Sequence, residues 1–165
     1  QPAGHGAYRH HCPARGELVT MDFGVVCGGY HSDITRTISV GYADARQREL
    51  YDAVLAAQKR ALAALRPGVT GIEVDRAARN VLAEHDLEQY FGHGLGHSLG
   101  LEIHEEPRLS KAGTTVLEEN MLITDEPGVY IPGWGGIRIE DTVLITADGA
   151  EALTHAPKEF IEICI

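Results

Sequence analysis

Three histidines, His93, His97 and His104, lie within twelve positions of a glycine-rich segment, YFGHGLGHSLGLEIHEEP at residues 90–107. One interpretation is an ordinary glycine-rich loop that carries histidines. The other is part of a metal site, because imidazole is a common ligand for divalent metals and acidic side chains follow closely. The second interpretation requires further ligands from distant parts of the chain.

Two acidic residues, Asp22 and Asp33, lie in neighbouring segments that both alternate like strands, GELVTMDFGVV and YHSDITRTISV. The Gly28-Gly29 pair between them is a hairpin signal. With that turn, Asp22 lies opposite Thr35, and the backbones of Asp22 and Asp33 are diagonal neighbours about 7–8 Å apart. Facing carboxylates repel unless a cation or a shared proton lies between them. The hairpin therefore favours a metal site.

Glu126 and Glu140 repeat this arrangement near the other end of the chain. They lie in two further segments that read as strands, MLITDEPGVYI and GGIRIEDTVLIT. Pro127, beside Glu126, marks an edge or a bulge. Four carboxylates and one histidine carry too much negative charge for one zinc ion and suit two divalent cations that share carboxylates. Such a pair makes hydroxide available near neutral pH.

Two helices are expected between these strand pairs. The first runs from about Asp44 to Leu65 and has an apolar stripe at helical spacing, and Arg-Pro-Gly ends it. Thr70 and Glu73 have the spacing of a capping box, so a second helix begins there and ends near His85.

After the second helix we expect a short strand near residues 101–104, and then a polar loop over residues 107–120. Two further strands complete the chain. Strands, then helices, then strands predict an α+β fold, in which a curved and mostly antiparallel sheet has its helices on one side.

Composition narrows the class of protein. A chain of 165 residues with 44% hydrophobic residues fits one domain, and its net charge of −10 argues against nucleic acid and anionic membranes as partners. Its apolar runs are too short to span a membrane. Cys12, Cys27 and Cys164 are scattered without a CxxC pair, which predicts a reducing compartment, the cytoplasm.

Five short motifs resemble those of a known family. They are MDFG (21–24), SDITRT (32–37), GHGLGH with HEEP (92–97 and 104–107), DEPGVY (125–130) and GGIRIED (135–141). In this order they are similar to the pita-bread metallopeptidases of the Xaa-Pro dipeptidase (prolidase) and aminopeptidase P group. The resemblance covers nearly the whole chain and implies the pita-bread fold.

The resemblance also implies which residues bind the metals. The family's ligands correspond to Asp22, Asp33, His97, Glu126 and Glu140, at matching intervals. The family's metal-binding histidine precedes the HEEP histidine by seven positions, which selects His97 among the three. Seven residues of extended strand span roughly 23 Å, so His97 and the HEEP histidine would not reach one centre unless the segment bends.

Further roles follow from the same resemblance. His104 is expected to donate to the substrate carbonyl and to the developing oxyanion, and His93 to help hold the substrate. Arg138 is expected to orient ligands or the substrate carboxylate. Glu126 doubles as general base and proton shuttle.

Upstream, a histidine of the family corresponds to His5, although Gly4 stands where the family has proline, and His10 and His11 compete for this place. The family's catalytic domain begins with two more helices and a strand, and a separate domain precedes it. We therefore expect residues 1–165 to be a catalytic domain that is incomplete at its N-terminus.

The implied activity is hydrolysis of the peptide bond that precedes proline, with a hydroxide that bridges two divalent metal ions as nucleophile. Manganese is favoured, and cobalt, zinc or iron would also suit the ligands. The expected substrate is a short peptide with proline at its second position, and the full-length protein is expected to be a homodimer. Dipeptidase and aminopeptidase activity are not distinguished.

One departure from the family lies beside a ligand, where Asp125 replaces a small hydrophobic residue. This acid would be harmless on the opposite strand face and would disturb the charge of the metal site otherwise. Two alternative functions remain, an enzyme like methionine aminopeptidase and a non-catalytic pita-bread module that binds peptide or protein. The complete ligand set and the motifs SDITRT and GGIRIED favour the proline-specific group.

Overall fold

The computed structural model describes residues 12–164, and its strands fall into two larger sheets and two short ribbons. The strands are β1 (Leu18–Phe23), β2 (Val26–Cys27), β3 (Tyr30–His31), β4 (Ile34–Val40), β5 (Gly96–Ser98), β6 (Glu105–Leu109), β7 (Leu122–Asp125), β8 (Gly128–Ile131), β9 (Gly135–Arg138), β10 (Asp141–Ile145), β11 (Ala150–Ala152) and β12 (Glu162–Ile163).

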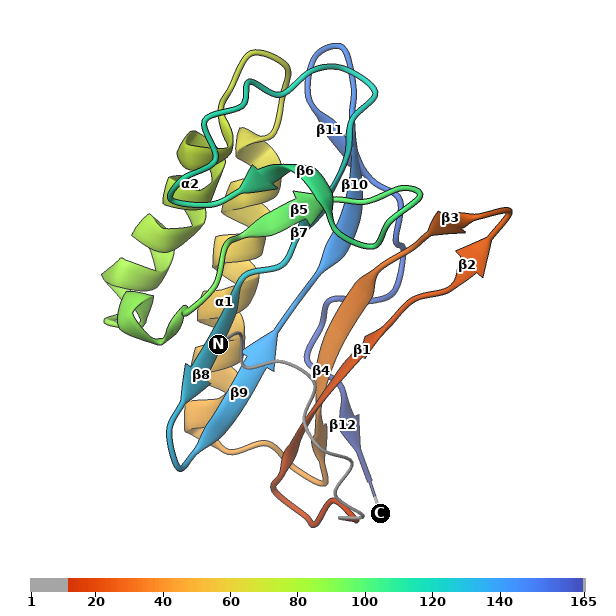
Figure 1. Cartoon of the computed structure of the whole chain (residues 1–165). Helices are drawn as coiled ribbons and strands as arrows, with labels where there is room; N and C mark the ends of the chain where they lie inside the picture. The colour runs from red at the N-terminus through yellow and green to blue at the C-terminus, as the bar shows by residue number, and fades with distance from the viewer. Residues whose placement is uncertain (1–11, 165) are drawn as a thin grey trace.

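The N-terminal strands form the expected hairpin. β1 and β4 are antiparallel with Asp22 opposite Thr35, and β2 and β3 continue the same register to the turn at Gly28-Gly29. Both glycines have positive φ, 58° and 88°, which suits the tight turns that join twisted strands. The predicted register is therefore confirmed. The β2–β3 ribbon projects beyond the rest of the sheet (Figure 1).

The second sheet has the order β11-β10-β7-β5-β6 and is antiparallel throughout. It meets the first sheet, β1-β4-β12, where Thr35 and Glu140 form an isolated bridge and the Glu140 N–H donates to the Thr35 carbonyl at 3.1 Å. This junction brings strands from both ends of the sequence to one place.

Each of the two long C-terminal strands that we expected is interrupted. β7 and β8 are separated at Glu126 and Pro127, and β9 and β10 are separated at Ile139 and Glu140. Pro127 has no N–H for a strand ladder. The N–H of Glu126 donates to the carbonyl of Leu95 instead, at 2.8 Å. The interruptions place two candidate ligands at bends rather than inside regular strands.

Helices α1 (Ala45–Ala64) and α2 (Gly71–Glu84) confirm both predicted helices. Asp44 caps α1, and Thr70 with Glu73 forms the predicted capping box of α2. The helices pack on each other and against the same side of the sheets (Figure 1). Their buried apolar residues form one cluster with those of the strands. This is the predicted α+β pita-bread arrangement. In residues 12–164, no helix is long and apolar enough to cross a membrane.

The segment after α2 differs from the prediction. Residues 101–104 form a turn and not a strand, with β5 before it and β6 after it. The polar loop begins later than residue 107, because β6 runs to Leu109. Three residues of β5 are too few for alternation to reveal a strand, and the turn reverses the chain between two histidines. This reversal decides the geometry of the site.

Candidate metal centre

Side chains from three separate parts of the chain converge at the junction of the sheets. Among residues 12–164, Asp33, His97 and Glu140 each offer a ligand atom, and these atoms all lie within 4.8 Å of one another. His97 Nε2 is 3.9 Å from Asp33 Oδ2 and 3.3 Å from Glu126 Oε1. Four of the five residues expected to bind metal therefore surround one small volume.

The local chain path explains how these side chains meet. Asp33 lies between β3 and β4, Glu126 between β7 and β8, and Glu140 between β9 and β10. At such interruptions the strict alternation of side chains is relieved, so a side chain can be aimed across the junction. His97 is in β5, next to β7 in the same sheet.

His97 is held with one ring nitrogen turned toward the acids. Its Nδ1 lies 3.0 Å from the carbonyl of Ser98 and donates to it, which leaves Nε2 without a proton and facing Asp33 and Glu126. The hydroxyl of Thr124 accepts from the His97 N–H at 3.0 Å and donates to Glu126 Oε1 at 3.1 Å. One hydroxyl thus fixes two candidate ligands.

The pKa values of this cluster indicate a site that positive charge would stabilise. Burial, with added repulsion from neighbouring acids, raises the pKa of Asp33 to about 6, that of Glu126 to about 7 and that of Glu140 to about 9. Burial is also the main reason that the pKa of His97 falls to about 4. Buried carboxyl groups whose negative charge is disfavoured, beside a neutral imidazole, form a donor set that divalent cations would suit.

Asp22 lies at the rim of this cluster. Its carboxylate forms an ion pair with Arg138 and is half exposed, and its charge and a hydrogen bond raise the pKa of Asp33. Asp22 is therefore beside Asp33, as the hairpin register predicts, but it is not among the residues whose ligand atoms lie within 4.8 Å of one another.

His104 lies closer to His97 than a straight strand would allow. Their ring centroids are 4.3 Å apart with the rings nearly perpendicular. The exception allowed for this spacing applies, because the segment bends and the chain reverses between β5 and β6. His104 thus lies against the ring of a candidate metal ligand.

His93 and Arg138 are linked through a tyrosine. The Tyr130 hydroxyl accepts from Arg138 Nη1 at 2.8 Å and lies 3.1 Å from His93 Nε2. The Nδ1 of His93 donates to the carbonyl of Gly94 at 2.8 Å, so its Nε2 accepts from the tyrosine. Arg138 also donates to Asp22 and to Thr35 Oγ1. Its donors are directed at side chains of the site, which favours the orienting role.

Sequence reasoning missed several residues that position the site. Thr124 lies just before the DEPGVY motif and Tyr130 ends it, but neither hydroxyl was given a role. From α2, Arg79 donates to the carbonyls of Phe91 and His93, while Asp75 pairs with Arg79. The sequence signal for this pair was an acid and an arginine four positions apart on the apolar face of α2, where charged residues need partners. His5 lies outside the described residues, as do His10 and His11.

Asp125 is turned away from the cluster. Its side chain is fully buried on the helix side of the sheet, where it accepts from Gln58 Nε2 of α1 at 3.1 Å. Burial and the charge of Asp141 raise its pKa well above the usual range. The departure from the family motif therefore does not add an acid to the candidate centre.

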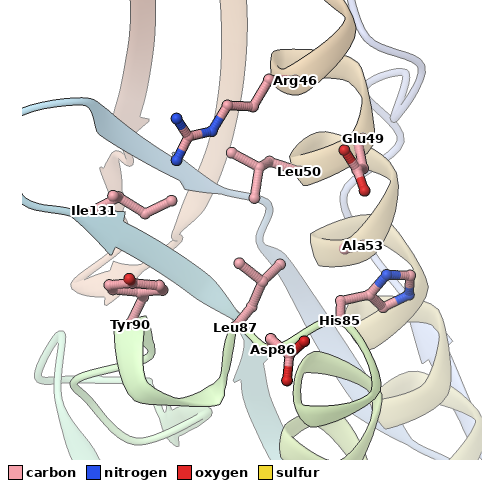
Figure 2. Close-up of a pocket in the computed structure, with 9 residues that line it drawn as sticks. All are labelled: Arg46, Glu49, Leu50, Ala53, His85, Asp86, Leu87, Tyr90 and Ile131. Carbon is pink, nitrogen blue, oxygen red and sulfur yellow. The ribbon is translucent and has the colours of Figure 1, made fainter.

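A separate cavity of about 240 Å³ lies between α1, the end of α2 and β8 (Figure 2). It is lined by Arg46, Glu49, Leu50, Ala53, His85, Asp86, Leu87, Tyr90 and Ile131. The candidate ligands do not line it, so the cavity and the cluster are different features.

Comparisons with known proteins agree with this geometry. Residues 3–147 match the model of metallopeptidase family M24. A Xaa-Pro dipeptidase of Pyrococcus horikoshii is 50% identical over 157 residues, which are 95% of this chain and 45% of that protein. The crystal structure of the prolidase from the same organism has a TM-score of 0.92 at 50% identity and covers 96% of this chain and 46% of that one.

An X-Pro aminopeptidase from Thermotoga maritima has a TM-score of 0.93 at 39% identity, over 98% of this chain and 45% of that one. The chain thus spans less than half the length of the curated relatives that it matches. A family match over most of the sequence, together with these identities, leads to one conclusion. The chain belongs to metallopeptidase family M24.

Proposed function

We propose that this chain supplies the metal-binding catalytic part of a peptidase that hydrolyses the bond preceding proline. The observation that carries the proposal is the convergence of Asp33, His97 and Glu140, with ligand atoms within 4.8 Å of one another. The names of its relatives, Xaa-Pro dipeptidase and X-Pro aminopeptidase, support the substrate class.

In this proposal Asp22, Asp33, His97, Glu126 and Glu140 hold two divalent cations, with manganese favoured. When bound, such a pair activates water and polarises the substrate carbonyl. Glu126, beside His97, takes the proton from the attacking water and passes it to the leaving nitrogen.

The surrounding residues orient the substrate and the developing charge. His104, whose ring lies against that of His97, donates to the oxyanion, and one such donor is typically worth about 3–4 kcal/mol. His93 contacts the substrate from a ring fixed by Tyr130 and the Gly94 carbonyl. Arg138 holds Asp22 in place.

The wider organisation remains a set of predictions. Residues 1–165 are proposed to form one catalytic unit of a protein that is a homodimer in its full-length form and resides in the cytoplasm. Its substrates are proposed to be short peptides with proline at the second position.

The test is hydrolysis by the manganese-loaded chain of an Ala-Pro dipeptide and an Ala-Pro-Ala tripeptide. We expect cleavage that a chelator abolishes and that His97→Ala removes, whereas His155→Ala, an exposed histidine, retains it. Manganese binding is measured in parallel by calorimetry. A chain that neither binds manganese nor cleaves either peptide would contradict the proposal, as would equal activity of the two histidine variants.

The same assay separates the alternatives. Release of methionine from a Met-Ala-Ser peptide, with no cleavage before proline, would indicate an enzyme like methionine aminopeptidase. Binding of Ala-Pro-Ala without hydrolysis in the presence of manganese would indicate a non-catalytic module. Preference between the dipeptide and the tripeptide distinguishes a dipeptidase from an aminopeptidase.

A further inference from the structure

Two acids, Asp125 and Asp141, face each other directly on the neighbouring strands β7 and β10. Both side chains are fully buried. Each directly adjoins a candidate metal ligand in sequence, Glu126 and Glu140 respectively. We refer to Asp125 and Asp141 as the interior acid pair. Two buried carboxyl groups at this spacing need hydrogen-bonding or charged partners, because they would repel each other if both were ionised without such partners.

Two cations, one amide and one hydroxyl surround the interior acid pair, and the hydroxyl of Thr154 donates to Asp141 at 2.7 Å. Arg36 Nη2 lies 2.8 Å from one oxygen of Asp141, and Lys158 Nζ lies 2.5 Å from the other. Gln58 Nε2 of α1 donates to both acids, at 3.1 Å each, and Lys158 donates to Gln58 Oε1 at 3.3 Å. Lys158 therefore contacts both the acid and the amide that bridges the acids.

The same cluster reaches the backbone of a candidate ligand. Arg36 Nη1 donates to the carbonyl of Glu140 at 2.5 Å and to that of Thr35 at 2.9 Å. Thr35 in turn donates from its hydroxyl to the carboxylate of Glu140. A displacement of Asp141 or of its guanidinium partner would thus be passed directly to Glu140.

Lys158 comes from the C-terminal segment, after β11 in sequence, and no motif of the family resemblance includes it. One oxygen of Asp125, Oδ1, is buried and has no hydrogen-bonding partner among the described residues. Loss of the ammonium group would leave the two facing acids with a single cation, Arg36, beside the neutral donors Gln58 and Thr154.

We propose that Lys158 is a positioning residue for the candidate metal centre: by bridging Asp141 and Gln58 it holds the interior acid pair in register, which fixes the backbone that presents Glu126 and Glu140. This inference rests on the proposed metal-binding function. It does not place Lys158 in contact with metal or substrate.

If Lys158 positions the ligands, its removal should weaken metal binding. If it acts only through its positive charge, its removal should strengthen metal binding. Loss of a nearby positive charge makes the site more negative, which by itself would tighten cation binding. Loss of the bridge leaves a buried acid pair poorly compensated, and the strands respond by separating. A weaker affinity for metal in a folded variant is therefore the signature of positioning.

The experiment is calorimetric titration of the chain with Mn²⁺, with circular dichroism to establish folding. The variants are Lys158→Met, Asp125→Leu and the double variant. Lys111→Met is the matched control, because Lys111 is an exposed lysine whose ion pair is with Glu88. Lys158→Met is expected to weaken Mn²⁺ binding about tenfold, the usual effect of losing a residue that supports metal ligands.

In the double variant, removal of one of the facing acids is expected to restore the affinity to within about twofold of the original chain. An affinity in Lys158→Met that equals or exceeds that of Lys111→Met would overturn the inference. So would a double variant that binds Mn²⁺ no better than Lys158→Met. If Lys158→Met does not fold, Lys158→Gln replaces it with the same expectations, and failure of Asp125→Leu to restore folding to either variant counts against the inference.

These outcomes are distinct from failure of the proposed function. An original chain that does not bind Mn²⁺ refutes the metal centre itself, and the positioning role falls with it. An original chain that binds Mn²⁺ as tightly as Lys158→Met refutes only the role of Lys158.

Discussion

The hydroxyl of Thr124 joins His97 and Glu126, whose Nε2 and Oε1 atoms lie 3.3 Å apart. It accepts from the backbone of the histidine and donates to the carboxylate of the glutamate. The two candidate ligands, 29 positions apart in the sequence, are therefore fixed relative to each other by a residue that is not a ligand.

Thr124→Val tests whether this hydroxyl bridge supports metal binding. Valine keeps the shape and removes the hydroxyl, so we expect a folded chain whose Mn²⁺ affinity falls about tenfold. Calorimetry measures this affinity. Thr146→Val is the control, because the Thr146 hydroxyl donates to the exposed residue Asp148, away from the candidate ligands. Equal affinities in the two variants would show that the bridge does not matter.

Gly96 is predicted to be essential for metal binding and stability, because there is no room for a side chain at this position. A Cβ atom at Gly96 would lie 1.9 Å from the Thr124 carbonyl oxygen, whereas one at Gly92 would meet nothing within 4 Å. Gly96→Ala must therefore push β5 away from β7 and move His97. We expect Gly96→Ala to lose Mn²⁺ binding and to lower the melting temperature, and Gly92→Ala to do neither. A Gly96→Ala chain that binds and melts like Gly92→Ala contradicts this packing.

Tyr130→Phe tests the link between His93 and Arg138. The phenylalanine removes one hydroxyl that bonds to both residues, and a lost hydrogen bond of about 1 kcal/mol corresponds to about fivefold in rate. We expect kcat for Ala-Pro hydrolysis to fall by that factor, with Mn²⁺ affinity unaffected. Tyr42→Phe, at an exposed tyrosine, is the control. A kcat equal to that of the control would show that the Tyr130 hydroxyl has no part in catalysis.

The metal-free chain should lose stability as pH rises above about 6.5. The folded-state pKa values of Glu126 and Glu140, about 7 and about 9, lie above the ordinary value of 4.5, so the folded chain binds more protons than the unfolded chain in this range. The free energy of unfolding then decreases with pH until both groups are ionised. Below this range His97 acts in the opposite sense, because its pKa is lowered to about 4.

Urea denaturation in the presence of a chelator, at pH 6.5, 8 and 9 (about the window of these two groups), measures the slope. Glu140→Gln should reduce it, because the amide has no proton to lose. Excess Mn²⁺ should also reduce it, because cations replace the protons. Stability that stays level or increases over this range without metal would contradict the burial of uncompensated acids.

The predictable parts of this structure are those set by local rules. The Gly28-Gly29 turn fixes the register of Asp22 against Thr35, and the capping box of Thr70 and Glu73 begins α2 where expected. Each of these features depends on a few adjacent residues and on simple periodicity. The α+β class follows from the same pattern.

The unpredicted parts depend on contacts between distant segments. The reversal at residues 101–104 follows two short strands, β5 and β6, with too few residues for a pattern. The partners of Tyr130 and Thr124 become apparent only once β8 and β7 are placed beside the histidine segment. The burial of Asp125 against Gln58 of α1 likewise depends on how the helix packs.

The central claim is that Asp33, His97, Glu126 and Glu140, with Asp22 at the rim, hold two cations. Anomalous diffraction from crystals grown with Mn²⁺ tests it most directly. We predict two anomalous peaks within about 4 Å of each other, each in coordination distance of these carboxylates, with His97 Nε2 bound to one. Ordered side chains around a site with no anomalous peak, at saturating Mn²⁺, would contradict the account.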